Sequence, residues 1–291
     1  MENRKTITVL VILISIVSAF TTITGIFSED GPGKYQYESI RGKVVTIYGQ
    51  GVYEHMSADV AIQGIAQDYI TLFIGIPLLL FSLFSARRGS LRGRFLLAGT
   101  LGYFLVTFLF YTTMAMYNIM FLAFVSLLAF SFFALLTTLF SFNTDSLPGM
   151  FSARTPVRFA GGFLIFTTIS IALLWLSIIV PPLIDGSVYP DSLDHYTTLI
   201  VQGMDLGLLL PIAFVSALLL IRRRPLGYLF APTYLVFLSI LMTALTAKII
   251  AMALNGVNVV PAVFIIPVFN ILSLICVIIL LKNINMNISN K

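Results

Sequence analysis

The chain of 291 residues is 58% hydrophobic and only 10% charged, with a mean hydropathy of +1.00. These values exclude a soluble globular domain and predict an integral membrane protein. The single cysteine, Cys276, excludes an intrachain disulfide and a thiolate metal cluster. The net charge of +5 comes from basic residues in short loops, where such residues set the membrane topology, so we expect no nucleic-acid partner.

Eight apolar segments, each of about 20 residues, are long enough to cross a hydrocarbon core of about 30 Å. They are predicted at residues 6–27, 69–86, 95–116, 119–142, 159–181, 199–221, 226–253 and 260–281. With the N-terminus in the cytoplasm, 13 of the 17 lysines and arginines fall in cytoplasmic segments. The positive-inside rule therefore predicts an all-α protein of the cytoplasmic (inner) membrane, with eight transmembrane helices and both termini in the cytoplasm.

The two longest segments outside the membrane follow the first and fifth spans. Residues 42–49 alternate β-branched side chains with others and end in glycine, a pattern typical of a short strand or hairpin. The corresponding segment, 181–198, is shorter and acidic. We expect both to lie on the outer face, with a short extracytoplasmic β-like element after the first span.

Several residues recur in the same order in the two halves of the chain. Four pairs share an offset of 134 residues, namely Pro77/Pro211, Ser82/Ser216, Arg88/Arg222 and Gly93/Gly227. Two further pairs share an offset of 137 residues, namely Asp68/Asp205 and Asn118/Asn255. This recurrence predicts an internal duplication.

The repeats are predicted to be two parallel four-helix units, residues 1–145 and 155–291. An even number of spans in each unit gives both units the same orientation in the membrane. The boundary is placed at 143–149, which is rich in turn-forming residues. In duplicated membrane proteins the working site usually lies between the repeats.

The loops that join the second and third spans of each repeat are strongly basic. We expect their arginines to contact anionic lipid headgroups, at about 1 kcal/mol each. The residues concerned are Arg87, Arg88, Arg222, Arg223 and Arg224. A regulatory lipid or nucleotide site in these loops is the alternative interpretation.

Polar residues gather where the second and sixth spans begin. Asp68 and Asp205 are accompanied by three glutamines, and Lys248 is the only charged residue inside the seventh span. Since ionisable groups inside a membrane are costly and usually functional, these residues predict a path for an ion or small solute. The residues of this path are Asp68, Asp205, Lys248, Gln63, Gln67 and Gln202. An ion pair of Lys248 with either aspartate is expected; the alternative role of the aspartates is helix N-terminal capping.

Pro77 and Pro211 lie within the second and sixth spans and are expected to break these helices beside the path. The alternative is that proline is merely tolerated in a membrane helix.

The two histidines, His55 and His195, precede the two aspartates at similar distances. Together with Asp68 and Asp205 they form a candidate site for zinc or another divalent metal. However, neither histidine has a partner at the i, i+4 spacing of a helical metal pair. Hydrogen-bonding loop residues, or a pH sensor on the outer face, are the alternatives.

Residues 87–94 followed by 98–103 resemble a group of prokaryotic multi-spanning membrane proteins with no assigned activity. The resemblance extends over most of the chain and implies the fold class, without site residues. No hydrolase, metalloprotease, Walker or dinucleotide-binding motif is present, so an enzyme is not favoured.

The leading functional hypothesis is a transporter or permease with its path between the two repeats. A second is a non-transporting sensor or assembly partner that binds a ligand through its outer loops, and it predicts a dry, fully packed membrane interior. A third is a membrane-embedded metal-dependent enzyme. The substrate and the oligomeric state do not follow from the sequence.

Overall fold

The computed structural model describes residues 4–285, and within them the chain forms eight helices that are long and apolar enough to cross a membrane. The protein is therefore an all-α, multi-pass membrane protein. The first four spans are α1 (Arg4–Phe27), α2 to α3 (Ala58–Arg87), α4 (Leu91–Met114) and α5 (Phe121–Phe140). The last four are α7 (Val157–Ile184), α8 to α9 (Ile200–Ile221), α10 (Pro225–Leu254) and α11 (Ala262–Lys282).

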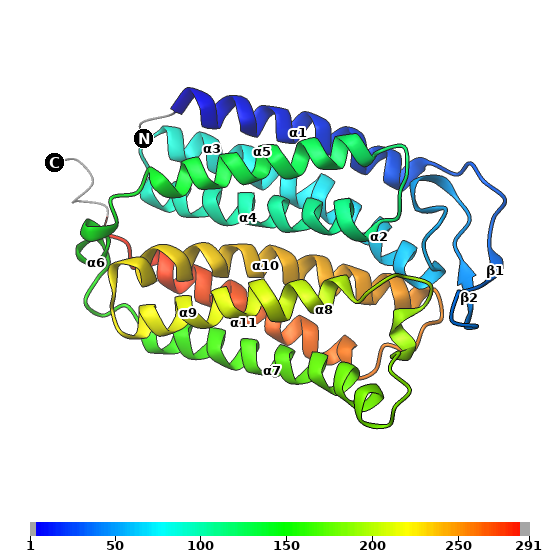
Figure 1. The fold of residues 1–291 in the computed structure, drawn as a ribbon. Helices are drawn as coiled ribbons and strands as arrows, with labels where there is room; N and C mark the ends of the chain where they lie inside the picture. The colour runs from blue at the N-terminus through cyan, green and yellow to red at the C-terminus, as the bar shows by residue number, and fades with distance from the viewer. Residues whose placement is uncertain (1–3, 286–291) are drawn as a thin grey trace.

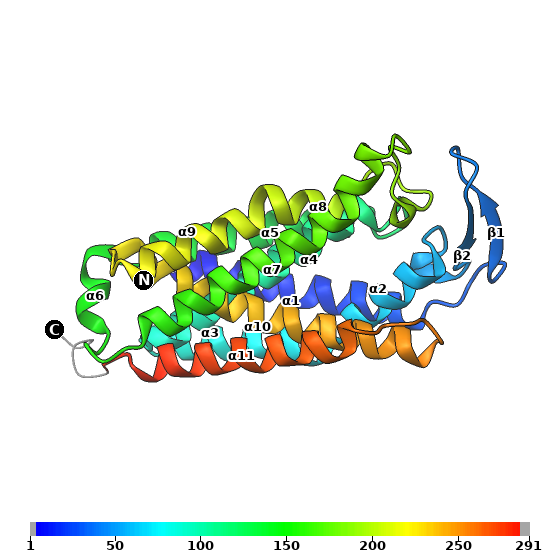
Figure 2. The ribbon, with the colours of Figure 1, turned by 90° about the horizontal axis from the view of Figure 1, so that it is seen from below.

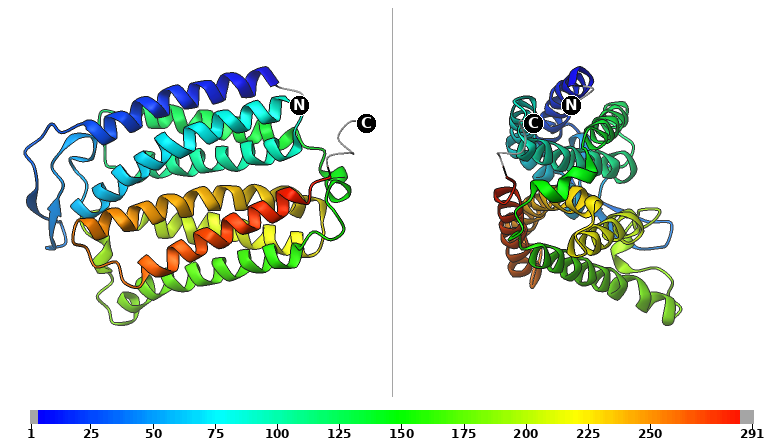
Figure 3. Two further views of the ribbon diagram at one scale, coloured as in Figure 1. Left: turned by 180° about the vertical axis from the view of Figure 1, so that it is seen from behind. Right: turned by 90° about the vertical axis from the view of Figure 1, so that its left-hand side faces the viewer.

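The eight spans form two groups that lie against each other (Figure 1). The first half of the chain, α1 to α5, makes one group, and the second half, α7 to α11, makes the other, as the view from behind also shows (Figure 3). Helix α4 packs against α10 along the seam between the groups, and α2 also packs on α10. A short linker with α6 (Leu147–Met150) joins the halves.

Helix α1 begins and α11 ends at the same end of the bundle (Figures 1 and 3). The loops at this end carry the arginines predicted to meet lipid headgroups, and we call it the basic end. The opposite end carries strands β1 (Tyr35–Glu38) and β2 (Val44–Ile47), and we call it the hairpin end. The strands pair antiparallel and project beyond the helix ends (Figure 2), so the extended element predicted after the first span is present.

The second span begins at Ala58, well before the predicted start at residue 69. The early turns of α2 contain Gln63, Gln67 and Asp68, which lower the local hydropathy. Gln67 and Asp68 are buried inside the protein, so the helix accommodates them without exposing them to lipid.

Each of these two polar spans contains one π-helical turn. The chain passes from α2 (Ala58–Ile70) through η2 (Thr71–Gly75) into α3 (Ile76–Arg87). It likewise passes from α8 (Ile200–Met204) through η5 (Asp205–Leu209) into α9 (Leu210–Ile221). Pro77 and Pro211 are the second residues of α3 and α9, so each wide turn lies where the proline ring would disturb a regular helix.

Matching bounds relate the two halves. The elements η2 and α3 lie 134 residues before η5 and α9, and the starts of α4 and α10 share this offset. A Cβ atom on Gly93 would collide with the backbone of Ala86, and one on Gly227 would collide with the backbone of Leu220. Both helices therefore need glycine as their third residue, while the duplication itself stays a prediction.

The 134-residue offset places Asp205, the first residue of η5, level with Thr71, the first residue of η2, while Asp68 lies three residues earlier in α2. Asn118 and Asn258 each accept a hydrogen bond from the backbone N–H two residues later in the chain, just before the starts of α5 and α11. The pairing of Asp68 with Asp205 and of Asn118 with Asn255 stays a prediction.

The seam is closed towards the basic end. A Cβ atom on Gly99 of α4 would lie 2.7 Å from the carbonyl oxygen of Thr233 and closer still to Val236, so α4 and α10 are in backbone contact there. An aromatic cluster fills the space below this contact. It consists of Phe95, Phe142, Phe151 and Tyr228, with neighbouring ring centroids 4.9 to 6.0 Å apart.

At the hairpin end, the loop of the first half holds the loop of the second. Arg41 donates hydrogen bonds to the carbonyl oxygens of Asp194 (2.9 Å) and Tyr196 (2.7 Å), and Lys43 forms a 3.0 Å ion pair with Asp194. Burial raises the pKa of the Tyr196 phenol, so this side chain stays neutral where its oxygen accepts the Ser57 backbone N–H. These contacts form a clasp between the halves.

Candidate functional site

A cavity of about 290 Å³ lies between the two halves. Its walls come from α2 and α4 of the first half and from α7, α8, η5 and α10 of the second, and most of its lining is apolar. On α10 the lining extends from Tyr234 to Lys248, a length of about 21 Å at 1.5 Å per residue. The polar and aromatic residues among the lining are Tyr53, Gln63, Gln67, Thr107, Phe110, Tyr111, Trp175, Asp205, Tyr234 and Lys248.

Asp68 lies directly behind this lining, with only 1% of its surface exposed. Its Oδ2 atom accepts a 2.5 Å hydrogen bond from the Tyr53 hydroxyl, and its Oδ1 atom accepts one of 2.9 Å from Tyr111. Gly25 of α1 packs on the carboxylate, and a Cβ atom there would collide with it. Asp68 is the eleventh residue of α2, so it has no capping role.

Lys248 reaches this region from the other half. Its side chain lines the cavity, behind whose wall Asp68 lies. The expected direct pair is not formed, because within residues 4–285 the one ion pair closer than 4.0 Å joins Lys43 to Asp194. No described residue accepts a hydrogen bond from Lys248, so its charge is available to a ligand in the cavity.

Asp205 is the second acid of the site and lies in the wall itself. Its Oδ2 atom accepts a 2.8 Å hydrogen bond from the indole N–H of Trp175, and no described residue donates to Oδ1. Asp205 begins the π-helical turn η5, inside a continuous span, so it is not an N-cap.

Gln67 connects α2 to α4 beside the cavity. Its amide nitrogen lies 2.7 Å from the Tyr103 hydroxyl and 3.2 Å from the Thr107 hydroxyl. The Thr71 hydroxyl, at the start of η2, is 2.8 Å from the same Tyr103 oxygen. The amide oxygen of Gln67 has no partner among the described residues, although the side chain is only 3% exposed.

Sequence reasoning missed the aromatic members of this site. Tyr53 and Tyr111 hold Asp68, and Trp175 holds Asp205, yet all three come from elements distant in the sequence. The available signal was chemical, because tyrosine and tryptophan inside a span need a partner for their polar atoms. Trp175 is also the only tryptophan in the chain.

Other predicted site residues lie away from the cavity or make local contacts. Gln63 lines it but donates to the backbone oxygen of Asp59, and Gln202 is not among the lining residues. Pro77 and Pro211 are exposed on the outside of the bundle, so the wide turns before them, and not their rings, approach the site.

The predicted metal site is not assembled. His195 contacts the backbone oxygen of His55 at 2.9 Å in the clasp, while Asp68 and Asp205 are held by aromatic residues. In the part of the chain that the structure describes, no three His, Cys, Asp or Glu side chains are placed to hold a metal ion.

Comparison of the chain with protein-family models, with curated proteins and with solved structures finds no match. The resemblance suggested by residues 87–103 therefore gains no support, and function must be inferred from the cavity.

Proposed function

We propose that the protein is a membrane transporter that moves a small organic solute through the cavity between its two halves. The observation that carries the proposal is the pair of charged residues on the cavity wall, Lys248 and Asp205, whose hydrogen-bonding capacity the protein leaves unfilled. Charged side chains inside a membrane are costly and are typically retained for a ligand or ion. A sensor with a dry interior does not need such a cavity.

The apolar lining favours an organic solute over a hydrated inorganic ion. Residues such as Val106, Phe110 and Leu238 cannot replace the water around a small ion, but they can pack against a hydrocarbon or aromatic body. Lys248 suits an acidic group of the solute, whereas Asp205 suits a hydrogen-bond donor.

The closed seam below the cavity suggests how transport proceeds. The contact at Gly99 and the aromatic cluster separate the cavity from the basic end. In transporters built from repeats, access alternates as one unit rocks against the other. The π-helical turns η2 and η5 lie in the spans beside the cavity, where local changes of helix winding often accompany function.

We further propose the predicted topology and duplication for this transporter. The basic end lies in the cytoplasm of a prokaryotic cell, and both termini lie on that side. Its arginines then meet the anionic lipids of the inner leaflet. The two halves are parallel repeats that need not be functionally equivalent, because Thr71 stands where the second half has Asp205.

Flux measurements on purified protein test the proposal. Proteoliposomes containing the pH dye pyranine are mixed with a panel of apolar carboxylates and amines, and the dye response and liposome swelling in excess of those of protein-free liposomes are recorded. We expect a response to at least one class, reduced about tenfold or more by Asp205→Asn and by Lys248→Met, because each removes a charged hydrogen bond.

The matched control is Asp185→Asn, at the exposed end of α7, which should transport like the wild type. A panel without any response, or equal responses from all three variants, would overturn the transporter proposal.

A further inference from the structure

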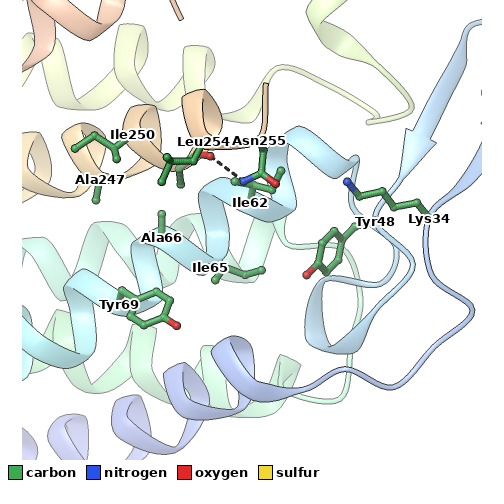
Figure 4. A pocket seen from close by; sticks show the side chains of 11 residues that line it. Lys34, Tyr48, Ile62, Ile65, Ala66, Tyr69, Ala247, Ile250, Leu254 and Asn255 are labelled. Carbon is green, nitrogen blue, oxygen red and sulfur yellow. Dashed lines mark hydrogen bonds between the residues drawn. The ribbon is translucent and has the colours of Figure 1, made fainter. Parts of the chain in front are cut away.

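A second hollow, of about 430 Å³, lies on the opposite side of the wall that α2 and α10 form (Figure 4). Three alanines leave space between the two helices, namely Ala66, Ala247 and Ala251. Tyr69 and Ile250 at its edge are 44% and 51% exposed, so the hollow is open on the outer surface of the bundle. In a membrane this surface faces lipid, and we call the hollow the lateral groove.

The polarity of the lateral groove changes along its length. Ile62 and Ile65 line the part between the helices, whereas Lys34, Tyr48 and Asn255 lie at the hairpin end (Figure 4). The groove extends from Ile62 to Tyr69 of α2, about 10 Å, which is a large part of one leaflet. A polar end at headgroup level and an apolar channel below it match the head and tail of a phospholipid.

Lys34 supplies an unneutralised positive charge at this end. Arg41 and Lys43, the other basic residues of the hairpin segment, are engaged by the second half through the clasp. Lys34 is exposed and has no hydrogen bond or ion pair to any residue in the described range 4–285. A phosphate is the natural counter-charge for an exposed lysine at a membrane surface.

We propose that the lateral groove binds one anionic phospholipid from the leaflet at the hairpin end. Its phosphate lies at Lys34, and one acyl chain lies along the alanine-lined channel. The same two helices carry Gln67 and Lys248 on their cavity side, so the bound lipid supports the wall of the candidate site. The inference concerns binding alone and does not depend on transport.

Native mass spectrometry of the full chain in detergent tests the proposal by counting bound lipids during titration. Phosphatidylglycerol is compared with phosphatidylcholine. We expect Ala247→Trp, which fills the groove, to bind one phosphatidylglycerol fewer than the wild type. The matched control is Ala253→Trp, an exposed position on the same helix, which should bind the wild-type number.

Lys34→Ala should keep the site but lose the severalfold preference for phosphatidylglycerol. Arg154→Ala, at the other end of the molecule, controls for the loss of one charge. A wild-type count retained by Ala247→Trp, or an unchanged lipid preference in Lys34→Ala, would overturn the proposal.

A site-specific measurement separates the groove from lipids bound at the basic end. A tryptophan probe is introduced by Tyr69→Trp in a Trp175→Phe background, and phosphatidylglycerol with brominated acyl chains is added. The proposal is supported if the tryptophan is quenched at low lipid concentrations and Lys34→Ala weakens this quenching. It is contradicted if brominated phosphatidylcholine quenches the tryptophan equally well.

Discussion

Replacing Gly99 with leucine will force the two halves of the bundle apart. The new side chain has no space, because even a Cβ atom would collide with Val236 and with the backbone oxygen of Thr233. A backbone atom cannot move aside as a flexible side chain can, so the change requires α4 and α10 to separate. Overpacking of this kind costs about 1–3 kcal/mol, and the rigid contact places Gly99→Leu at the upper end.

The measurement is thermal unfolding in mild detergent, followed by intrinsic fluorescence. Gly162→Leu on α7 is the matched control, because a side chain at that glycine would meet open space. We expect a large fall in Tm for Gly99→Leu and almost none for the control. Equal Tm values would mean that the seam is loosely packed and that the closed contact below the cavity does not exist.

Asp68→Ala will destabilise the first half of the protein. The change removes the carboxylate that accepts from the Tyr53 and Tyr111 hydroxyls. Tyr111 keeps its 3.1 Å bond to the Gly64 carbonyl oxygen, and Tyr53 keeps a 3.3 Å bond to Tyr111. An unsatisfied buried group costs about 1–3 kcal/mol, and because both hydroxyls keep a weaker partner, a total of about 1–3 kcal/mol is expected. Asp68→Asn keeps one acceptor oxygen and should fall between Asp68→Ala and the wild type.

A compensating variant separates the loss of hydrogen bonds from the loss of charge. In Asp68→Leu combined with Tyr53→Phe and Tyr111→Phe, no polar group is left unpaired, so part of the stability should return. Asp59→Ala, at an exposed position of the same helix, is the control. If Asp68→Ala unfolds at the same temperature as Asp59→Ala, the two-tyrosine cage is not formed.

The sequence predicted the eight spans well because each is a long apolar run. The start of the second span could not be placed, because Gln63, Gln67 and Asp68 make this segment resemble a loop. It is recognised as part of a span only when the hydrogen-bond partners of Asp68 are known. Those partners, Tyr53 and Tyr111, lie 15 residues before and 43 residues after Asp68. Only the folded chain brings them together.

The candidate site was predicted in part. Asp205, Lys248 and Gln67 line the cavity, and their charge or polarity within apolar spans was a sufficient signal. The pairing of Asp68 with Asp205 stays a prediction, although the matching π-helical turns place Thr71, and not Asp68, at the offset of Asp205. The metal site was predicted from residue type alone, and the histidines instead meet through a backbone oxygen.

The central claim is that water and solute reach the cavity alternately from the two ends of the bundle. Cysteine accessibility tests it without knowledge of the substrate, since Cys276→Ser gives a cysteine-free chain. Leu245→Cys probes the cavity wall, and Val236→Cys probes the packed seam nearer the basic end, where Val236 is buried against Gly99. Each is treated with a membrane-impermeant thiol reagent from one side of sealed vesicles at a time.

The account predicts that Leu245→Cys reacts from the hairpin end and that Val236→Cys reacts, more slowly, only from the basic end. Failure of both to react until detergent dissolves the membrane would contradict it and leave a static, sealed bundle.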